Sequence, residues 1–355
     1  MTIRIRRTGL FLAAGFLLIL PELKGADAAE AGLFKKKETK SILKPALIVP
    51  PTDDLDQNSN SKHEQESALF LAIAPEIPEQ VEFCGKTIDL RRSDLRERFD
   101  REMLAMMYMH STTLTLLKRA NRYFPVIEPI LKANGIPDDI KYLACIESSL
   151  NPRAISTAKA VGMWQFMPET ARQFGLEVSD DVDQRYDVAL ETQAACDYLK
   201  GAYQKYGDWP TACASYNTGT ARVSNELERQ GVNSGLDLWL VEETQRYVFR
   251  ILTCKEFFKD PKKYGFYIKS EQLYQPMMFK DTIVSGRVAD WVSFAKEAGI
   301  SFYDLKSNNS WIRNDSLPNP ELRSYKVAIP LKESLFFDKN NLVVHQKNWV
   351  TDKKK

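Results

Sequence analysis

The stretch from Pro137 to Pro168 constrains this chain more than any other. Pro137 suits the first turn of a helix, and Pro152 prevents that helix from running much past Leu150. Within the predicted helix, Glu147 falls on the stripe at i, i+3, i+4 and i+7 that also contains Ile140, Leu143 and Ala144. A carboxylate therefore stands where a further apolar residue is expected.

Partial burial disfavours the charged form of a carboxylate and raises its pKa, so that Glu147 can remain a proton donor near neutral pH. Glu147 is thus a candidate general acid. Helical spacing alone also allows a structural interpretation, in which Glu147 pairs with an arginine such as Arg153 at the helix end.

Three tracts follow in order along the chain. The first begins at Glu147 and runs through Asn-Pro-Arg-Ala and Gly-Met-Trp-Gln-Phe-Met-Pro to Ala171. The second is Ala-Ser-Tyr-Asn-Thr-Gly, residues 214–219, and the third is Glu-Thr-Gln-Arg-Tyr-Val, residues 243–248. Together they resemble the three signatures of the lytic transglycosylases related to goose-type lysozyme. The helical segments predicted before them and the further small domain predicted after them make the resemblance closest to the membrane-bound D branch of that family. A match of this length is far more specific than a short motif.

The resemblance implies a mainly α fold, lysozyme-like, in which helices pack around the helix of Glu147. It implies cleavage of the β-1,4 bond between N-acetylmuramic acid and N-acetylglucosamine in peptidoglycan, with a 1,6-anhydro ring as product and with one glutamate acting first as acid and then as base. The resembled reaction uses no cofactor and no metal. Glu147 would be catalytic, and the substrate would be bound by Ser156, Gln165, Met167, Tyr216, Asn217, Glu243 and Tyr247.

Two other readings of the site stay open. A hydrolase of lysozyme type would need a second carboxylate, such as Asp180 or Asp181, to activate water. A catalytically silent scaffold that binds the cell wall would keep the groove but would not need the acid.

The sequence also predicts a domain order. Residues 1–28 have basic residues, an apolar run and Ala26-Asp27-Ala28, which is typical of a cleaved signal peptide for export to the periplasm or cell envelope. The alternative is that this segment is retained as a membrane anchor, although its apolar run is short for a membrane span. Residues 29–80 are predicted to form a disordered linker. The catalytic domain is expected at 81–267, helical from its start, and a LysM-like α+β domain of order β-α-α-β at 275–336, followed by a flexible tail at 337–355. Its opening tract only partly matches that of glycan-binding LysM modules, which makes glycan binding by this domain doubtful.

Composition limits the partners. The 355 residues carry a formal net charge of +2, which does not suggest a nucleic-acid-binding surface. The expected partners are peptidoglycan glycan strands and cell-envelope assemblies, with the chain itself a monomer.

The five cysteines lack the close spacing of a disulfide framework or zinc site, so most are expected to be buried apolar residues. Asp183, Arg185 and Asp187 are interpreted as a salt-bridge and helix-capping group.

Overall fold

The computed structural model describes residues 73–352. The predicted signal peptide and nearly all of the predicted linker lie outside these residues. No helix within the described part is both long and apolar enough to cross a membrane.

A β-hairpin, not a helix, begins the catalytic region. Its strands are β1 (Gln80–Phe83) and β2 (Lys86–Asp89), with Val81 opposite Ile88. Both turn residues have positive φ, 50° at Cys84 and 80° at Gly85, as a two-residue hairpin of type I′ requires. Val81, Phe83, Ile88 and Leu90 are all buried, so the apolar period is two and the helical expectation from Val81 was wrong.

Several helix ends of the catalytic domain fall at proline and glycine positions, although α2 (His110–Ala133) continues through Pro125 and Pro129. The other helices are α1 (Ser93–Tyr108), α3 (Lys141–Ser148), α4 (Pro168–Gln173), α5 (Val188–Tyr206), α6 (Trp209–Thr218), α7 (Thr220–Gln230) and α8 (Glu242–Lys259). Pro168 and Pro210 stand in first turns, and Gly207 ends α5 in the left-handed conformation. The Asn-Thr-Gly end of the second tract would suit a left-handed cap at Gly219, but this glycine ends α6 with a φ of 88° and a ψ of 144°, outside the left-handed helical region.

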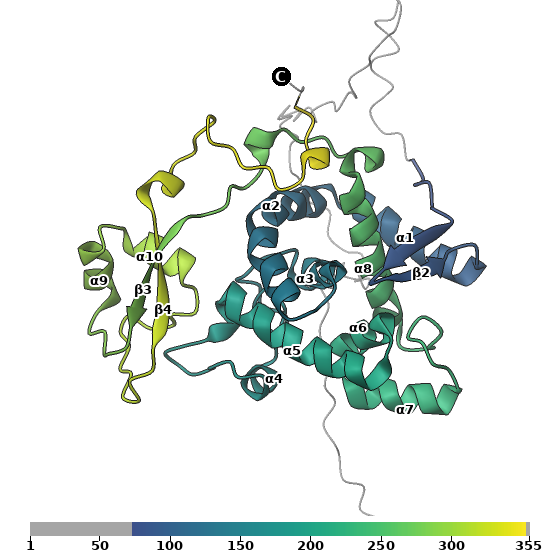
Figure 1. The fold of residues 1–355 in the computed structure, drawn as a ribbon, viewed down its shortest axis with the longest axis horizontal. Coiled ribbons are helices and arrows are strands. Elements are labelled where there is room, and N and C mark those ends of the chain that lie inside the picture. The colour runs from purple at the N-terminus through teal and green to yellow at the C-terminus, as the bar shows by residue number, and fades with distance from the viewer. Residues whose placement is uncertain (1–72, 353–355) are drawn as a thin grey trace, which may run out of the picture. The chain divides into compact units, whose positions relative to one another are not determined.

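The short helix α3 lies in the middle of this domain, packed against α2 and α8 (Figure 1). A single apolar core runs from the hairpin through all of these helices, and Cys145, Cys196, Cys213 and Cys254 are buried in it as expected. Of the methionines around α1, Met103 is fully buried and Met109 is exposed.

The C-terminal domain has the predicted β-α-α-β order, with β3 (Phe279–Val284), α9 (Trp291–Glu297), α10 (Phe302–Asn308) and β4 (Tyr325–Pro330). The two strands pair antiparallel, with Phe279 opposite Pro330 and Val284 opposite Tyr325. Trp291, Trp311 and Val327 form its core.

The prediction of a flexible tail is wrong for residues 343–352. Trp349 is 2% exposed, and its indole nitrogen donates to the carbonyl of Phe258 at 2.9 Å. The backbone nitrogen of Thr351 donates to Ile268, and that of His345 donates to the side chain of Asn121. One buried tryptophan and these bonds overcome the chain entropy that a polar, lysine-rich end would otherwise keep.

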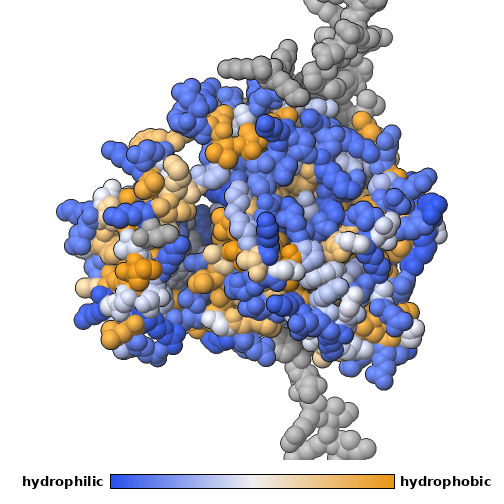
Figure 2. All heavy atoms as spheres, viewed as in Figure 1, coloured by the Kyte–Doolittle hydropathy of each residue, from blue (hydrophilic) through white to orange (hydrophobic). Residues whose placement is uncertain are grey.

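The visible face of the described residues is mostly hydrophilic, with hydrophobic residues scattered between charged ones (Figure 2). This distribution is ordinary for a folded domain surface.

Candidate active site

Glu147 lies in the last turn of α3, where the chain reverses. Ile140, Leu143 and Ala144 are fully buried, which confirms the predicted apolar stripe, and Glu147 itself is half-buried. Ser149 and Leu150 then take positive φ values of 51° and 55°. Such backbone is unfavourable for residues with side chains, and it turns the chain sharply away just after the carboxylate.

The partner of Glu147 comes from α8. The phenolic hydroxyl of Tyr247 donates a hydrogen bond to Oε1 of Glu147, and Tyr247 is 2% exposed. Arg250, one turn further along α8, donates to the carbonyl of Ile146 at 3.0 Å and brings a positive charge near the same carboxylate. The predicted alternative partner, Arg153, makes no contact with it.

Burial raises the pKa of Glu147 to about 7, against the opposing effects of the Tyr247 hydrogen bond and the Arg250 charge. The nearby charge of Glu243 raises this pKa further. At neutral pH a substantial fraction of Glu147 therefore carries a proton, which is the condition for a general acid.

A tight loop between α3 and α4 faces this helix end. Val161 and Phe166 exchange backbone hydrogen bonds of 3.0 Å and close a small turn that contains Trp164 and Gln165. Gln165 has a φ of 55°, and its side-chain nitrogen donates to the carbonyls of Gly162 and Ala154. Its side-chain oxygen remains able to accept a hydrogen bond from a ligand.

Glu191 clamps this loop from α5. Its carboxylate accepts hydrogen bonds from the backbone nitrogens of Met163 at 2.8 Å and Trp164 at 3.0 Å, and the residue is fully buried. Burial raises the pKa of Glu191 well above its usual value. Our sequence reasoning missed this residue, although Glu191, Ala195 and Leu199 share a helical stripe as Glu147 does with its own neighbours.

Gly162 allows the clamp to form. Its φ is 91°, and a Cβ atom at this position would collide with the carbonyl oxygen of Arg185 and with the carboxylate of Glu191. Only glycine lets the loop approach α5 this closely.

The second tract, residues 214–219 at the end of α6, contacts the loop from another side. The hydroxyl of Tyr216 donates to the carbonyl of Trp164 at 2.8 Å, and burial, followed by the nearby charge of Glu147, raises the pKa of Tyr216 well above its usual value. Asn217 accepts a hydrogen bond from the hydroxyl of Thr244 at 2.9 Å, which leaves its amide nitrogen able to donate to a ligand. The structure therefore brings Glu147, Tyr216, Glu243 and Tyr247 together near the end of α3, and Thr244 links Asn217 to α8.

The other predicted residues have mainly local contacts. Ser156 is buried, and its hydroxyl accepts from the backbone nitrogen of Ala160 at 3.0 Å, so that it braces the loop. Met167 is half-buried and immediately precedes α4. Asp181 accepts a hydrogen bond from Asn314 in the C-terminal domain, and neither it nor Asp180 is in contact with Glu147.

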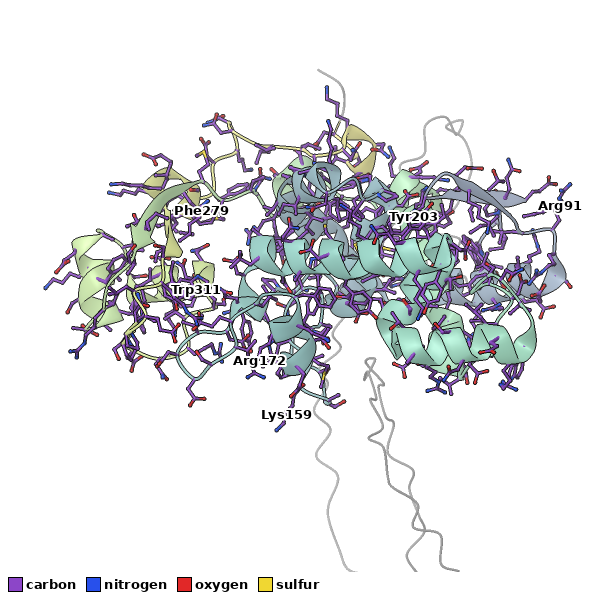
Figure 3. All side chains as sticks on the ribbon, turned by 60° about the horizontal axis from the view of Figure 1, so that its bottom comes forward. Arg91, Lys159, Arg172, Tyr203, Phe279 and Trp311 are labelled. Carbon is purple, nitrogen blue, oxygen red and sulfur yellow. The ribbon has the colours of Figure 1, made fainter. Side chains whose placement is uncertain are left out.

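A cavity of about 410 Å³ is lined by Asp181, by α4 and by the C-terminal domain, including Arg172, Leu317, Arg323 and Tyr325, and by none of the predicted catalytic or substrate-binding residues. Figure 3 labels Arg172 on α4 and Trp311 in the C-terminal domain.

Within residues 73–352, no three histidine, cysteine, aspartate or glutamate side chains gather in a way that could hold a metal ion.

Two protein-family models match parts of this chain. Residues 124–236 match the model of the transglycosylase SLT domain, and residues 280–333 match that of the soluble lytic transglycosylase C-terminal LysM-like domain. These two parts of the chain are thus similar to an SLT domain and to a LysM-like domain, in the predicted order, in agreement with the predicted fold class and family resemblance.

Among individual proteins, the chain is homologous to membrane-bound lytic murein transglycosylase D of Escherichia coli (strain K12). The two are 29% identical over 253 residues, which cover 68% of this chain and 54% of the relative, so the chain spans about half of that relative's length. It is also 32% identical over 122 residues to a putative tributyltin chloride resistance protein of Alteromonas sp. (strain M-1), covering 34% of this chain and 59% of that one. The crystal structure of the 70 kDa soluble lytic transglycosylase of Escherichia coli matches with 21% identity and a TM-score of 0.35, covering 46% of this chain and 29% of that one.

Proposed function

We propose that this protein is a peptidoglycan lytic transglycosylase in which Glu147 acts first as general acid and then as general base. One observation carries the proposal. A half-buried carboxyl group with a pKa of about 7 stands at the end of α3, within the SLT domain, facing polar side chains from α6 and α8.

In the first step, protonated Glu147 donates its proton to the oxygen of the β-1,4 bond between N-acetylmuramic acid and N-acetylglucosamine, and the bond from that oxygen to C1 of muramic acid breaks. In the second, the Glu147 carboxylate accepts the proton of the muramyl C6 hydroxyl, whose oxygen bonds to C1. The proton count balances, Glu147 returns to its starting state, and no water is consumed.

The surrounding groups suit this sequence. Tyr247 donates to the carboxylate and stabilises its charged form between the two steps, because its hydrogen bond lowers the pKa of Glu147. The free donor of Asn217 and the free acceptor of Gln165 are suited to sugar hydroxyl and acetamido groups. We assign Ser156 and Met167 to support of the loop and of its apolar side, and Glu243 to electrostatic tuning of Glu147.

We place the protein in the cell envelope, in contact with glycan strands. The name of the murein transglycosylase relative and the signal-like residues 1–28 support this location.

The test is mass spectrometry of the muropeptides released from purified peptidoglycan by the full chain, with the Glu147→Gln variant as control. We expect products ending in 1,6-anhydromuramic acid from the unmodified protein and none from the variant. Reducing ends would instead indicate a hydrolase of lysozyme type. Binding to the wall without release by either protein would indicate a scaffold.

A further inference from the structure

The C-terminal domain is joined to the catalytic domain by a short piece of β-structure. Residues around Ile312 pair antiparallel with residues around Val182, through hydrogen bonds of 2.9 Å from Asp183 N to the Trp311 carbonyl and from Arg313 N to the Asp181 carbonyl. Such backbone pairing fixes register as well as contact.

Side chains extend this junction on both sides. Arg323 and the hydroxyl of Tyr325 both donate to Glu177 at 2.9 Å, and Asn314 donates to Asp181 at 2.7 Å. The guanidinium of Arg313 lies 4.5 Å from the ring centre of Tyr186.

The apolar core of the C-terminal domain includes catalytic-domain residues. Val161, Val182 and Tyr186 are all buried in one cluster with Trp311 and Ile312. Val161 is also one of the two residues that close the turn containing Gln165.

From the junction, a continuous series of contacts reaches the candidate active site. Asp183 forms a buried, bidentate ion pair with Arg185, and Arg185 donates to the carbonyl of Phe166 at 3.1 Å. Phe166 pairs with Val161 around Trp164, whose carbonyl accepts the hydroxyl of Tyr216. Asp183 and Arg185 thus serve as the predicted salt-bridge group, and Asp187 caps α5 as expected.

We propose that the C-terminal LysM-like domain is a positioning element for the active-site loop, residues 159–167, and that it acts on the proposed reaction through the isolated β-bridge between Ile312 and Val182 and the two backbone hydrogen bonds that flank it. This inference rests on the proposed function for its effect on turnover. In this proposal the LysM-like domain affects catalysis by holding the active-site loop in place, and it needs no glycan-binding site of its own.

The experiment uses the full chain and a matched pair of substitutions at the exposed residue Arg313. Arg313→Pro removes the backbone donor to Asp181 together with the side-chain contacts to Tyr186 and to the Ser310 carbonyl, whereas Arg313→Ala removes only the side-chain contacts. Ile283→Ser, at a residue of β3 that is 62% exposed, is the control for glycan binding by the strand surface.

Two measurements are made on each variant. The first is hydrogen exchange of the amides in residues 159–167, compared with the amides of β3 and β4, which report whether the C-terminal domain stays folded. The second is kcat and KM on purified glycan strands.

We expect Arg313→Pro to speed amide exchange in the loop and to leave exchange in β3 and β4 unchanged. It should also lower kcat/KM about fivefold to tenfold, which corresponds to the free energy of about one lost hydrogen bond. Arg313→Ala should have a smaller effect, and Ile283→Ser none. The proposal is overturned if loop exchange is the same in both Arg313 variants and the unmodified protein, or if Ile283→Ser alone reduces kcat/KM. The exchange result needs no turnover, so it decides the inference even if the proposed activity itself fails.

Discussion

The hydroxyl of Tyr247 donates a hydrogen bond to the carboxylate of Glu147 across a sequence separation of 100 residues. Tyr247 is buried and Glu147 is half-buried, and the hydrogen bond and the desolvation of the carboxylate act in opposite directions on the pKa of Glu147. The balance sets the pKa of Glu147 near neutrality, where one group can both give and take a proton.

Replacing Tyr247 by phenylalanine tests this balance. The hydrogen bond favours the charged form, so its loss should raise the pKa of Glu147 above about 7. The alkaline limb of the profile of kcat/KM against pH should then move to higher pH. Tyr203→Phe, at a partly exposed residue, is the control, and an alkaline limb that stays in place would count against the assigned role of Glu147.

Glu147→Gln should change stability in a pH-dependent way. The pKa of Glu147 in the folded protein, about 7, exceeds its ordinary value of 4.5, so the folded state binds the proton more tightly and the free energy of unfolding falls as pH rises from about 4.5 to 7. Glutamine has no titratable carboxyl group, so the variant does not lose this stability as pH rises. Because the residue is only half-buried, we expect a gain of about 1–3 kcal/mol at pH 8 and little gain at pH 4.5. Denaturant unfolding at both pH values measures it, and an equal difference at both would contradict the pKa.

Gly162→Ala should destabilise the catalytic domain by about 2–4 kcal/mol. The new methyl group would collide with the backbone of Arg185, at a positive φ that alanine adopts poorly. Gly201→Ala is the matched control, since it lies inside α5 with open space around it, and it should be neutral or stabilising by up to about 1 kcal/mol. Thermal unfolding of the two variants compares them, and similar melting temperatures would disprove the close approach.

Trp349→Ala should destabilise the catalytic domain, although it lies near the end of the chain. Its ring packs against Phe124 and Phe258, so its loss leaves a cavity and should cost about 3–5 kcal/mol. Phe337→Ala, at a residue 60% exposed, should cost less than about 0.5 kcal/mol. Limited proteolysis of residues 340–352 provides a second readout, and equal resistance in both variants would argue against the packed tail.

Helix ends and the apolar stripe of α3 were predictable from the sequence because they depend on neighbouring residues. Pro168, Pro210 and Gly207 act within one turn of the helix, and the spacing of Ile140, Leu143 and Glu147 is a property of helical geometry. Glu147, Tyr216 and Asn217 could likewise be selected before any coordinates, although what each contacts could not.

The hairpin at residues 80–89 was missed although its period of two was visible, because its strands are short and stand directly before long helices. The tail was missed for a different reason, since polar composition gives no sign that Trp349 finds a buried site against Phe258.

The mainly helical class, the position of a carboxylate on an apolar stripe and the order of the two domains follow from residue spacing along the chain. The hydrogen bond of Tyr247 to Glu147, the bonds of Glu191 to the loop and the β-bridge between Ile312 and Val182 are instead set by tertiary packing. Each of these contacts joins residues far apart in the chain, and its energy depends on burial and on distances that only packing sets.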